Sequence, residues 1–398
     1  MFRRECKQAA VLVLCLPLLT GCWDRREVND VAFVSGTGID KVKEGYRTTV
    51  LYPLAGQLGG VGSSGGGGGT SGNRSWHLDS VTGTSLKETN NIQQQAMSRQ
   101  LYFAHRRVLV IGEGAARSGL APILDIVARV PQNRMTGYIL VTKGDARDFM
   151  DVDVEVEKIP TEMIRELALN YMRTPRTVKE TVHALLSEGM DPALPYCVVD
   201  RTKPGRSGQQ KPMMKLEGLA VFREDKLAGL MKGEEAQGVL WAMNEAKRPT
   251  IVLPAPGGTG MQAVQFAVAQ TRIRPVVSGG KITMRIDIRA RGSVAENQSN
   301  YISGQDYTHA KLEETLNRKI KSMVDKSLKA LQTEYGSDPV GFGDILYRSE
   351  PKVWRGIREQ WREKYKEVEM AVSVHTQVQH TGTIIKPIGR KERMMNHE

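Results

Sequence analysis

The chain has 398 residues, a formal net charge of +12 at pH 7 and 25% charged residues. This length exceeds what one ordinary hydrophobic core holds, so it predicts two or three domains and excludes a single small one. Beyond residue 21, no apolar run approaches the ~20 residues that a membrane-spanning helix needs. No zinc-finger or RNA-recognition pattern accompanies the basic charge, so the sequence does not indicate a nucleic-acid partner.

The N-terminus has the pattern of a bacterial lipoprotein signal peptide. Arg3, Arg4 and Lys7 precede an apolar run of eleven residues at 9–19, and the run ends in Leu-Thr-Gly-Cys at 19–22. Such a run is too short to span a bilayer. We predict that residues 1–21 form a signal peptide and that Cys22, the first mature residue, carries a thioether-linked lipid. The alternatives are a plain signal peptide or an uncleaved anchor with a chance cysteine.

The predicted lipid anchor places the mature chain on the outer face of a cell membrane. Two acyl chains, at ~0.8 kcal/mol per buried CH₂, give stable anchoring. Removal of residues 1–21 takes away three basic residues and one acidic residue, which leaves a net charge of +10. On an exported protein this charge favours attraction to anionic lipid headgroups or wall polymers, and export argues against nucleic acid.

Cysteine usage excludes an intrachain disulfide framework. Cys6 and Cys15 lie in the signal peptide, Cys22 is used by the lipid, and Cys197 remains alone. Cys197 lies in an apolar, strand-like run at 195–199. It is therefore interpreted as a small buried hydrophobe and not as a reactive thiol.

Residues 22–150 predict an N-terminal α+β domain. In the segment 56–72, ten of seventeen residues are glycine, which predicts a flexible loop because neither helix nor strand tolerates that backbone entropy. Apolar periodicity predicts a helix with a clear apolar stripe at 115–129. The remaining predicted elements are strands at 31–39, 46–54, 74–81, 108–111 and 138–142 and a helix at 85–99.

The rest of the chain predicts a helical middle region, a linker and a second α+β domain. Residues 151–202 are mainly helical in pattern, and the basic, Pro- and Gly-containing segment 203–213 is the predicted linker. The C-terminal domain spans 214–390, before a charged tail at 391–398. Its predicted elements are strands at 214–222, 226–231, 264–275, 281–290 and 368–378 and helices at 234–246, 307–335 and 351–365. The fold class is therefore α+β and multi-domain, each domain a mainly antiparallel or mixed sheet packed with helices.

No motif in the chain predicts catalysis, a metal or a cofactor. Gly112-Glu113-Gly114 follows a strand and precedes a helix, but the third glycine of a dinucleotide fingerprint is absent, since Arg117 stands there. The Gly-x-Ser-x-Gly match at 62–66 lies inside the glycine-rich loop and not at a strand-to-helix elbow. His375 and His380 would point to opposite faces of a strand. His105 is either a ligand contact or, more commonly, a satisfied histidine at a strand edge.

Several segments resemble the Ger(x)C family, the lipoprotein C subunits of spore nutrient-germinant receptors. Residues 22–30 read Cys-Trp-Asp-Arg-Arg-Glu-Val-Asn-Asp, which resembles the mature start of that family. The likeness continues through 36–40, 105–119, 216–222 and 338–343, in the expected order. Family members more often have aspartate, isoleucine and phenylalanine before the glycine of the last segment, where this chain has Asp338, Pro339 and Val340.

This resemblance implies a three-domain α+β lipoprotein on the outer face of the spore's inner membrane. It also implies integral-membrane A and B subunits as partners, a role in starting germination, and no catalytic activity. The competing class is another cell-envelope lipoprotein, solute-binding or hydrolytic. A hydrolase needs a nucleophile or carboxylate site and a solute binder needs two similar lobes, and the sequence shows neither.

Overall fold

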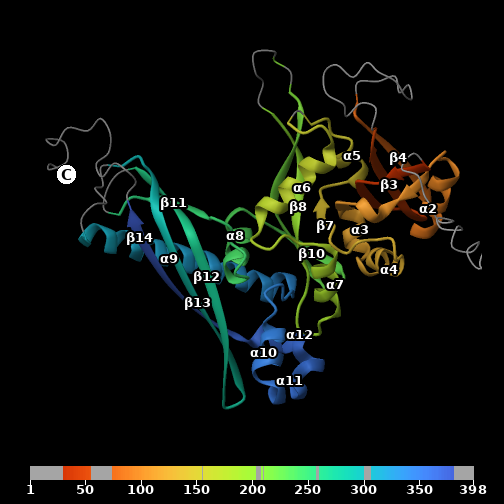
Figure 1. The fold of residues 1–398 in the computed structure, drawn as a ribbon. Helices are drawn as coiled ribbons and strands as arrows, with labels where there is room; N and C mark the ends of the chain where they lie inside the picture. The colour runs from red at the N-terminus through yellow and green to blue at the C-terminus, as the bar shows by residue number, and fades with distance from the viewer. Residues whose placement is uncertain are drawn as a thin grey trace, which may run out of the picture.

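The computed structural model describes residues 30–54, 74–154, 156–202, 208, 210–256, 260–299 and 306–380 (Figure 1). The predicted signal peptide, Cys22, the glycine-rich loop at 56–72 and the tail at 391–398 lie outside these residues. Two separate sheets with their own helices confirm the predicted α+β fold of more than one domain.

An eight-stranded mixed sheet forms the larger part of the molecule. Its order is β10-β9-β8-β7-β6-β2-β3-β4. The four central strands, β2, β6, β7 and β8, run parallel, and the two pairs at either edge are antiparallel. The strands are β2 (Gly36–Val42), β3 (Gly45–Pro53), β4 (Trp76–Gly83), β6 (Val108–Gly112), β7 (Tyr138–Thr142), β8 (Ala193–Arg201), β9 (Pro212–Arg223) and β10 (Lys226–Lys232).

Helices cover both faces of this sheet, as an all-apolar central strand such as β6 requires. Leu109 and Ile111 face a core shared with α2 (Leu86–Gln95), α3 (Glu113–Ser118), α4 (Ala121–Arg129) and α7 (Val178–Leu186). Val108 and Val110 face the opposite core, with α5 (Ala146–Met150) and α6 (Pro160–Tyr171). A short parallel pair, β1 (Val31–Phe33) and β5 (Gln100–Tyr102), lies beside β3 and continues into the 3₁₀ turn η4 (Phe103–His105).

The segment 203–213, predicted as a linker, instead joins two paired strands. β8 and β9 are antiparallel partners, from Ala193 opposite Val221 to Arg201 opposite Pro212. β9 and β10 therefore belong to the same sheet as β8. Composition alone did not predict this strand pairing. The middle region, predicted to be mainly helical, contains α6 and α7 and ends in β8.

A four-stranded sheet forms the second unit, in the order β11-β12-β13-β14. Its strands are β11 (Thr250–Pro254), which the sequence did not predict, β12 (Met261–Ser278), β13 (Lys281–Asn297) and β14 (Glu369–His380). β14 pairs parallel to β13 and the other pairs are antiparallel. β12 and β13 form a hairpin whose turn has Gly279 and Gly280 both at positive φ, as a two-residue turn of this hand requires.

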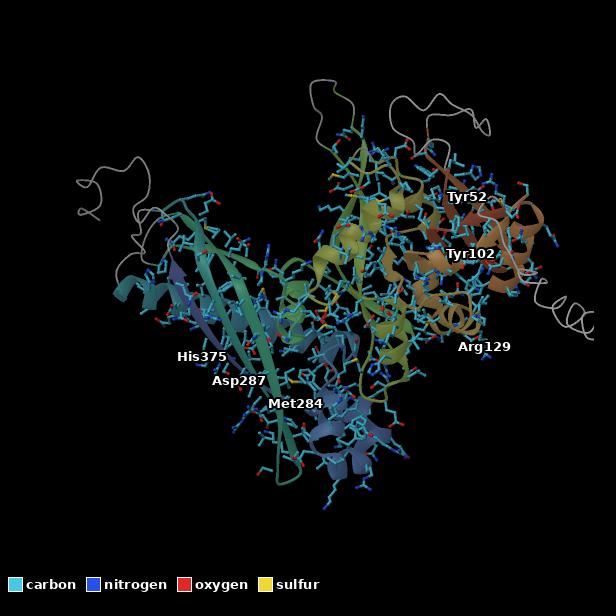
Figure 2. The ribbon with its side chains drawn as sticks, in the orientation of Figure 1. Tyr52, Tyr102, Arg129, Met284, Asp287 and His375 are labelled. Carbon is cyan, nitrogen blue, oxygen red and sulfur yellow. The ribbon has the colours of Figure 1, made fainter. Side chains whose placement is uncertain are left out.

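One face of this sheet carries the core and the other carries charge. Ile282, Met284, Ile286 and Ile288 pack against α8 (Gly233–Ala242) and the long helix α9 (Asp306–Ala330). Five arginines are exposed on the opposite face: Arg272, Arg274, Arg285, Arg289 and Arg291. Figure 2 shows Asp287 and His375 on this sheet, at the opposite end of the molecule from Tyr52 and Tyr102.

Three short helices connect α9 to β14 and lie beside the lower end of the β12–β13 hairpin in Figure 1. They are α10 (Phe342–Ser349), which the sequence did not predict, α11 (Pro351–Ile357) and α12 (Trp361–Glu367). The predicted helix at 351–365 is thus two helices, separated by the turn at Arg358–Gln360. The predicted helix at 307–335 is confirmed, with a last π-helical turn that ends at Gly336. The predicted helix at 115–129 is broken at Gly119, whose φ of 128° is not helical.

Candidate functional site

Two aspartates that lie far apart in the sequence meet at the junction of the two sheets. Asp191 precedes β8, and Asp338 precedes α10; their residues are 5% and 3% exposed. The backbone N–H of Asp191 donates to the carbonyl of Asp338 at 2.9 Å. In return, the N–H of Asp338 donates to Oδ2 of Asp191 at 2.9 Å. This reciprocal pair fixes the α10 segment against the edge of the larger sheet.

The Asp338 carboxylate holds the start of α10. It accepts hydrogen bonds from the backbone N–H groups of Gly341 at 2.9 Å, Phe342 at 3.0 Å and Gly343 at 3.0 Å. These N–H groups have no partner inside the helix, so the carboxylate satisfies donors that would otherwise be buried and unpaired. Burial nevertheless raises the pKa of Asp338 to about 7, because the three N–H donors only partly offset desolvation and the nearby Asp191 charge.

Asp191 extends the same contact to two more elements. Its Oδ1 accepts from the N–H of Glu224 at 2.8 Å and from Arg362 Nη2 at 3.3 Å. Arg362 also pairs with the Glu224 carboxylate, with Nε and Oε1 separated by 3.1 Å. Glu224 lies in the turn between β9 and β10, and Arg362 lies in α12. One carboxylate therefore connects the larger sheet to the C-terminal helices.

Two glycines bring the backbones of this junction into direct contact. A Cβ on Gly189 would lie 2.4 Å from the carbonyl carbon of Gly343, and a Cβ on Gly343 would lie 2.6 Å from the Cα of Gly189. Both distances are far below van der Waals contact, so only glycine fits at either position. We call Gly189, Asp191, Asp338, Gly343 and Arg362 the domain junction.

A cavity of about 370 Å³ opens beside the domain junction, between α7, the start of β8 and the segment after α8. Its walls carry both signs of charge. Arg176 pairs with Glu245 at 3.4 Å, and the other Glu245 oxygen accepts from the N–H of Thr174 at 2.7 Å. Arg176 and Glu245 therefore compensate one another, and Lys179, Glu180 and Asp191 add further charges of both signs to the lining.

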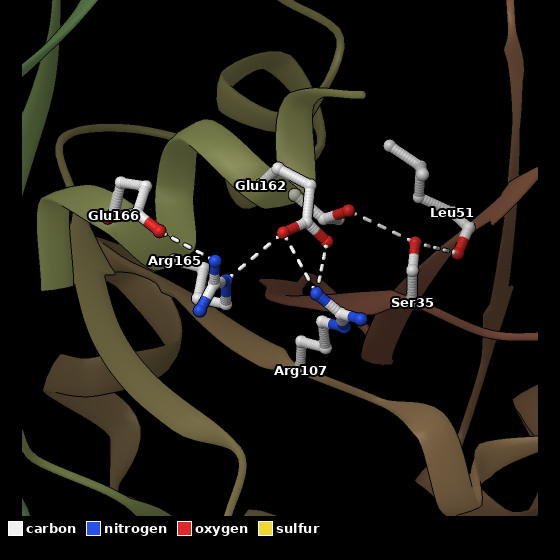
Figure 3. Close-up of polar contacts among 7 residues, drawn as sticks. Ser35, Leu51, Arg107, Glu162, Arg165 and Glu166 are labelled. Carbon is white, nitrogen blue, oxygen red and sulfur yellow. Dashed lines mark hydrogen bonds and ion pairs between the residues drawn. The ribbon is translucent and has the colours of Figure 1, made fainter. Parts of the chain in front are cut away.

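A polar network attaches α6 to the first strands of the larger sheet (Figure 3). Arg107 Nη1 lies 2.9 Å from each oxygen of Glu162, which also accepts from Arg165 at 3.1 Å. The Thr161 hydroxyl donates to the Ser35 hydroxyl at 3.1 Å. The ion pairs are substantially exposed, so they fix the position of α6 more than they stabilise the fold.

The other residues that the sequence analysis considered as possible functional sites are His105, Cys197, His375 and Cys22. His105 is exposed and packs against the rings of Phe33 and Tyr102, at centroid distances of 5.2 and 5.9 Å. Cys197 is buried, as predicted, and burial raises the pKa of its thiol to about 12, which suppresses the thiolate. His375 is exposed on β14, away from the domain junction. Cys22 lies outside the described residues, so its lipidation stays a prediction.

Gly112, the first glycine of the incomplete fingerprint, leaves room for a carboxylate of the chain itself. A Cβ on Gly112 would lie 2.1 Å from Oδ1 of Asp40, whereas a Cβ on Gly114 would meet only Lys41 Cβ at 3.9 Å. The buried Asp40 carboxylate accepts from the N–H groups of Ala146 at 2.6 Å and Arg147 at 3.2 Å, at the start of α5.

Within the described ranges, no three His, Cys, Asp or Glu side chains are grouped to hold a metal ion. No helix in the same part of the chain is long and apolar enough to cross a membrane. At the domain junction, the carboxylates of Asp191 and Asp338 accept from backbone N–H groups of other segments and so hold those segments together. The sequence singled out the segment 338–343 by its family likeness but did not predict that Asp338 caps a helix. The available signal was an aspartate, a common capping residue, shortly before Gly341 and the first helical residue, Phe342.

Comparisons with known proteins cover nearly the whole chain. Residues 24–199 match the family described as "Spore germination protein N-terminal domain", and residues 217–382 match "Spore germination B3/ GerAC like, C-terminal". The first match ends within β8, at residue 199, and the second begins within β9, at residue 217.

Individual relatives agree with these family matches. The Bacillus subtilis (strain 168) protein YfkR is 40% identical over 377 residues, which cover 95% of this chain and 97% of YfkR. Spore germination protein KC of the same organism is 28% identical over 406 residues, covering 97% of this chain and 98% of KC. The crystal structure of the GerBC protein superimposes with a TM-score of 0.56 at 18% identity, over 89% of this chain and 99% of GerBC, and shows the same fold.

Proposed function

Because this chain belongs to the Ger(x)C family of spore germination proteins, we propose that it is a non-catalytic lipoprotein subunit of a nutrient germinant receptor. In this proposal Cys22 anchors it to the outer face of the spore's inner membrane. There it acts with integral-membrane A and B subunits to trigger germination. The observation that carries the proposal is the similarity to spore germination proteins over nearly the full length of the chain.

Two features support the membrane location. The sequence at 19–22 has the lipobox pattern, and two acyl chains would hold the mature protein at the bilayer. The exposed arginines of the β12–β13 face, Arg272, Arg274, Arg285, Arg289 and Arg291, would be attracted to anionic headgroups. A tether of this kind also raises the effective concentration of the subunit around membrane-embedded partners.

The test compares spores that carry Cys22→Ala with spores that carry Cys197→Ala. Cys197 is the matched control, since it is the other cysteine of the predicted mature chain and is buried in the sheet. We expect Cys22→Ala to release the protein from the membrane fraction and to abolish the nutrient response. Germination by a trigger that bypasses receptors should persist. Cys197→Ala should retain both the membrane location and the nutrient response.

A deletion of the whole gene separates the two ways in which this proposal can fail. If Cys22→Ala germinates normally while the deletion does not, the receptor role stands and the anchor is dispensable. If the deletion also germinates normally with every nutrient tested, the proposed receptor role is wrong.

A further inference from the structure

A second cavity, of about 260 Å³, lies on the larger sheet at the end away from the C-terminal helices. Its floor is formed by β2 and β3, and its walls by α2, α4 and the segment from β5 into η4. Tyr102 and Arg129, labelled in Figure 2, mark the two walls next to β5 and α4. This volume is below that of cavities for drug-sized ligands and suits a small metabolite.

Arg106 lines this cavity and is a buried cation without a counter-charge. Its residue is 8% exposed, and its Nη2 has no hydrogen-bond partner among the described residues. No carboxylate in the described ranges forms an ion pair with it, and burial lowers its pKa to about 10. The next residue, Arg107, is half exposed and pairs with Glu162. Two adjacent arginines thus have opposite environments, and only the buried one has no partner.

The rest of the lining is polar on one side and apolar on the other. Besides Arg106, its only charged residue is Lys87, so no carboxylate faces the cavity. Two further buried polar atoms, Thr37 Oγ1 and Asn133 Oδ1, have no partner among the described residues. Six side-chain amides line the cavity: Asn90, Asn91, Gln94, Gln100, Gln132 and Asn133. Buried polar groups in native proteins are normally paired, so several such atoms at one cavity indicate a ligand that pairs with them.

We propose that this cavity binds a small organic monocarboxylate, with the carboxylate on the guanidinium of Arg106. The planar guanidinium matches a carboxylate with two parallel hydrogen bonds. Thr37 Oγ1 and Asn133 Oδ1, which have no partner among the described residues, would bind hydroxyl groups of the ligand. Both ends of the Gln94 amide and Oε1 of Gln132 already bond backbone groups, so they shape the cavity instead. Ile126 and Val127 of α4 would contact its apolar part.

The lining favours a carboxylate over the other small charged ligands. A free phosphate has no apolar part to place against α4. It also carries more charge than the one buried guanidinium neutralises, since Lys87, the other cation of the lining, is exposed to solvent. A zwitterion would bring an ammonium group, and the cavity offers it no carboxylate. This inference does not depend on the proposed role in germination, since it rests on the lining of the cavity alone.

Titration calorimetry and thermal unfolding of the full-length chain in detergent test the proposal. The probes are sodium acetate, lactate, butyrate and benzoate, with inorganic phosphate as the competing anion, all at one ionic strength. We expect saturable, one-to-one binding of at least one carboxylate, with a rise in Tm, and no saturable binding of phosphate.

Arg106→Met removes the charge but keeps an unbranched apolar side chain of similar length. It should weaken carboxylate binding at least tenfold, which is about 1.4 kcal/mol. It should also raise Tm in the absence of carboxylate, because an unpaired buried charge is removed. Arg201→Met is the matched control: Arg201 is exposed on β8 and lies outside the lining, so affinity and Tm should not change.

Arg106→Lys keeps the positive charge but loses the planar guanidinium that forms two parallel hydrogen bonds. This variant replaces Arg106→Met in the experiment if Arg106→Met does not fold. Its expected affinity for carboxylate lies below that of the natural chain. Three results would overturn the proposal: no carboxylate binds, phosphate binds as tightly as the carboxylates, or the Arg106 variant that folds binds as the natural chain does.

Discussion

The domain junction and the Arg106 cavity both bury a charged side chain, and they differ in where its partners come from. At the domain junction, Asp338 accepts three backbone N–H groups of its own chain and touches Asp191. In the cavity, Arg106 is almost as deeply buried, and its Nη2 has no partner among the described residues. The first charge is part of the architecture of the fold, whereas the second indicates a partner from outside.

This difference predicts opposite responses to removal of the charge. A buried charge that is fully hydrogen-bonded leaves several unpaired groups behind when it is removed, so truncation is costly. A buried charge without partners has already lost its hydration, so truncation relieves a penalty. The free energy of unfolding of variants at the domain junction therefore tests whether its buried charge is satisfied by the chain itself.

Asp338→Ala should have the largest effect. It leaves the N–H groups of Phe342 and Gly343 buried and unpaired, and leaves the N–H of Gly341 with only its 3.3 Å bond to the carbonyl of residue 338. The expected cost is roughly 3–5 kcal/mol in the free energy of unfolding. Urea denaturation followed by circular dichroism measures this loss. Asp200→Ala is the control, because Asp200 is exposed and pairs only with Lys215 and its own neighbour's N–H. If both variants lose equally little, the domain junction does not hold the two units together.

Gly343→Ala should have the next largest effect, through sterics alone. Its methyl group would overlap the Gly189 backbone and the Trp361 ring, at an expected cost of about 1–3 kcal/mol. Gly356→Ala is the matched control in the neighbouring helix α11, where a Cβ meets nothing within 4 Å. Because alanine is the better helix former, that control should gain about 0.5–1 kcal/mol. A loss at Gly356, or none at Gly343, would contradict the close approach of the two backbones.

The free energy of unfolding should also depend on pH through the titration of Asp338. Burial raises its pKa from 3.8 to about 7, and the charge of Asp191 acts in the same direction. A carboxyl group whose pKa is higher in the folded chain than in the unfolded chain stabilises the fold when it is protonated. Its contribution is complete below about pH 4 and is lost as the pH rises through about 7.

Asp338→Asn isolates this contribution, because the amide does not titrate. Between pH 5 and 8, the stability of the natural chain should fall relative to that of Asp338→Asn, as measured by urea denaturation at both values. If the stability of both proteins changes equally between pH 5 and 8, Asp338 is ionised over that whole range. The three N–H donors would then lower its pKa more than burial raises it.

Much of the fold could be predicted from the sequence, because apolar periodicity reports local structure. The predicted strand at 138–142 coincides with β7, and the predicted strand at 281–290 lies within β13. The predicted linker at 203–213 shows the limit. Whether two strands are partners in one sheet depends on contacts between segments, and local composition does not encode them.

The buried charges could not be predicted for the same reason. Arg106 and Arg107 are adjacent and identical in type, and only the fold places one in a cavity and the other against Glu162. Asp338 was recognised as part of a segment with family likeness. Its partner Asp191, however, lies 147 residues away along the chain, so their contact is visible only in three dimensions.

Thr177→Ala should have the smallest effect of these substitutions, because its contact is local. The Thr177 hydroxyl accepts from the N–H of Glu180, and the Glu180 carboxylate accepts from the N–H of Thr177 at 3.2 Å, which forms a capping box at the start of α7. Loss of this cap should cost about 1 kcal/mol in urea denaturation. Thr136→Ala, at an exposed position, should change stability by less than about 0.5 kcal/mol. If Thr177→Ala lowers the free energy of unfolding as much as Asp338→Ala does, the position of α7 in the cavity wall depends on its own cap. The contact between Asp191 and Asp338 would then not be what holds it.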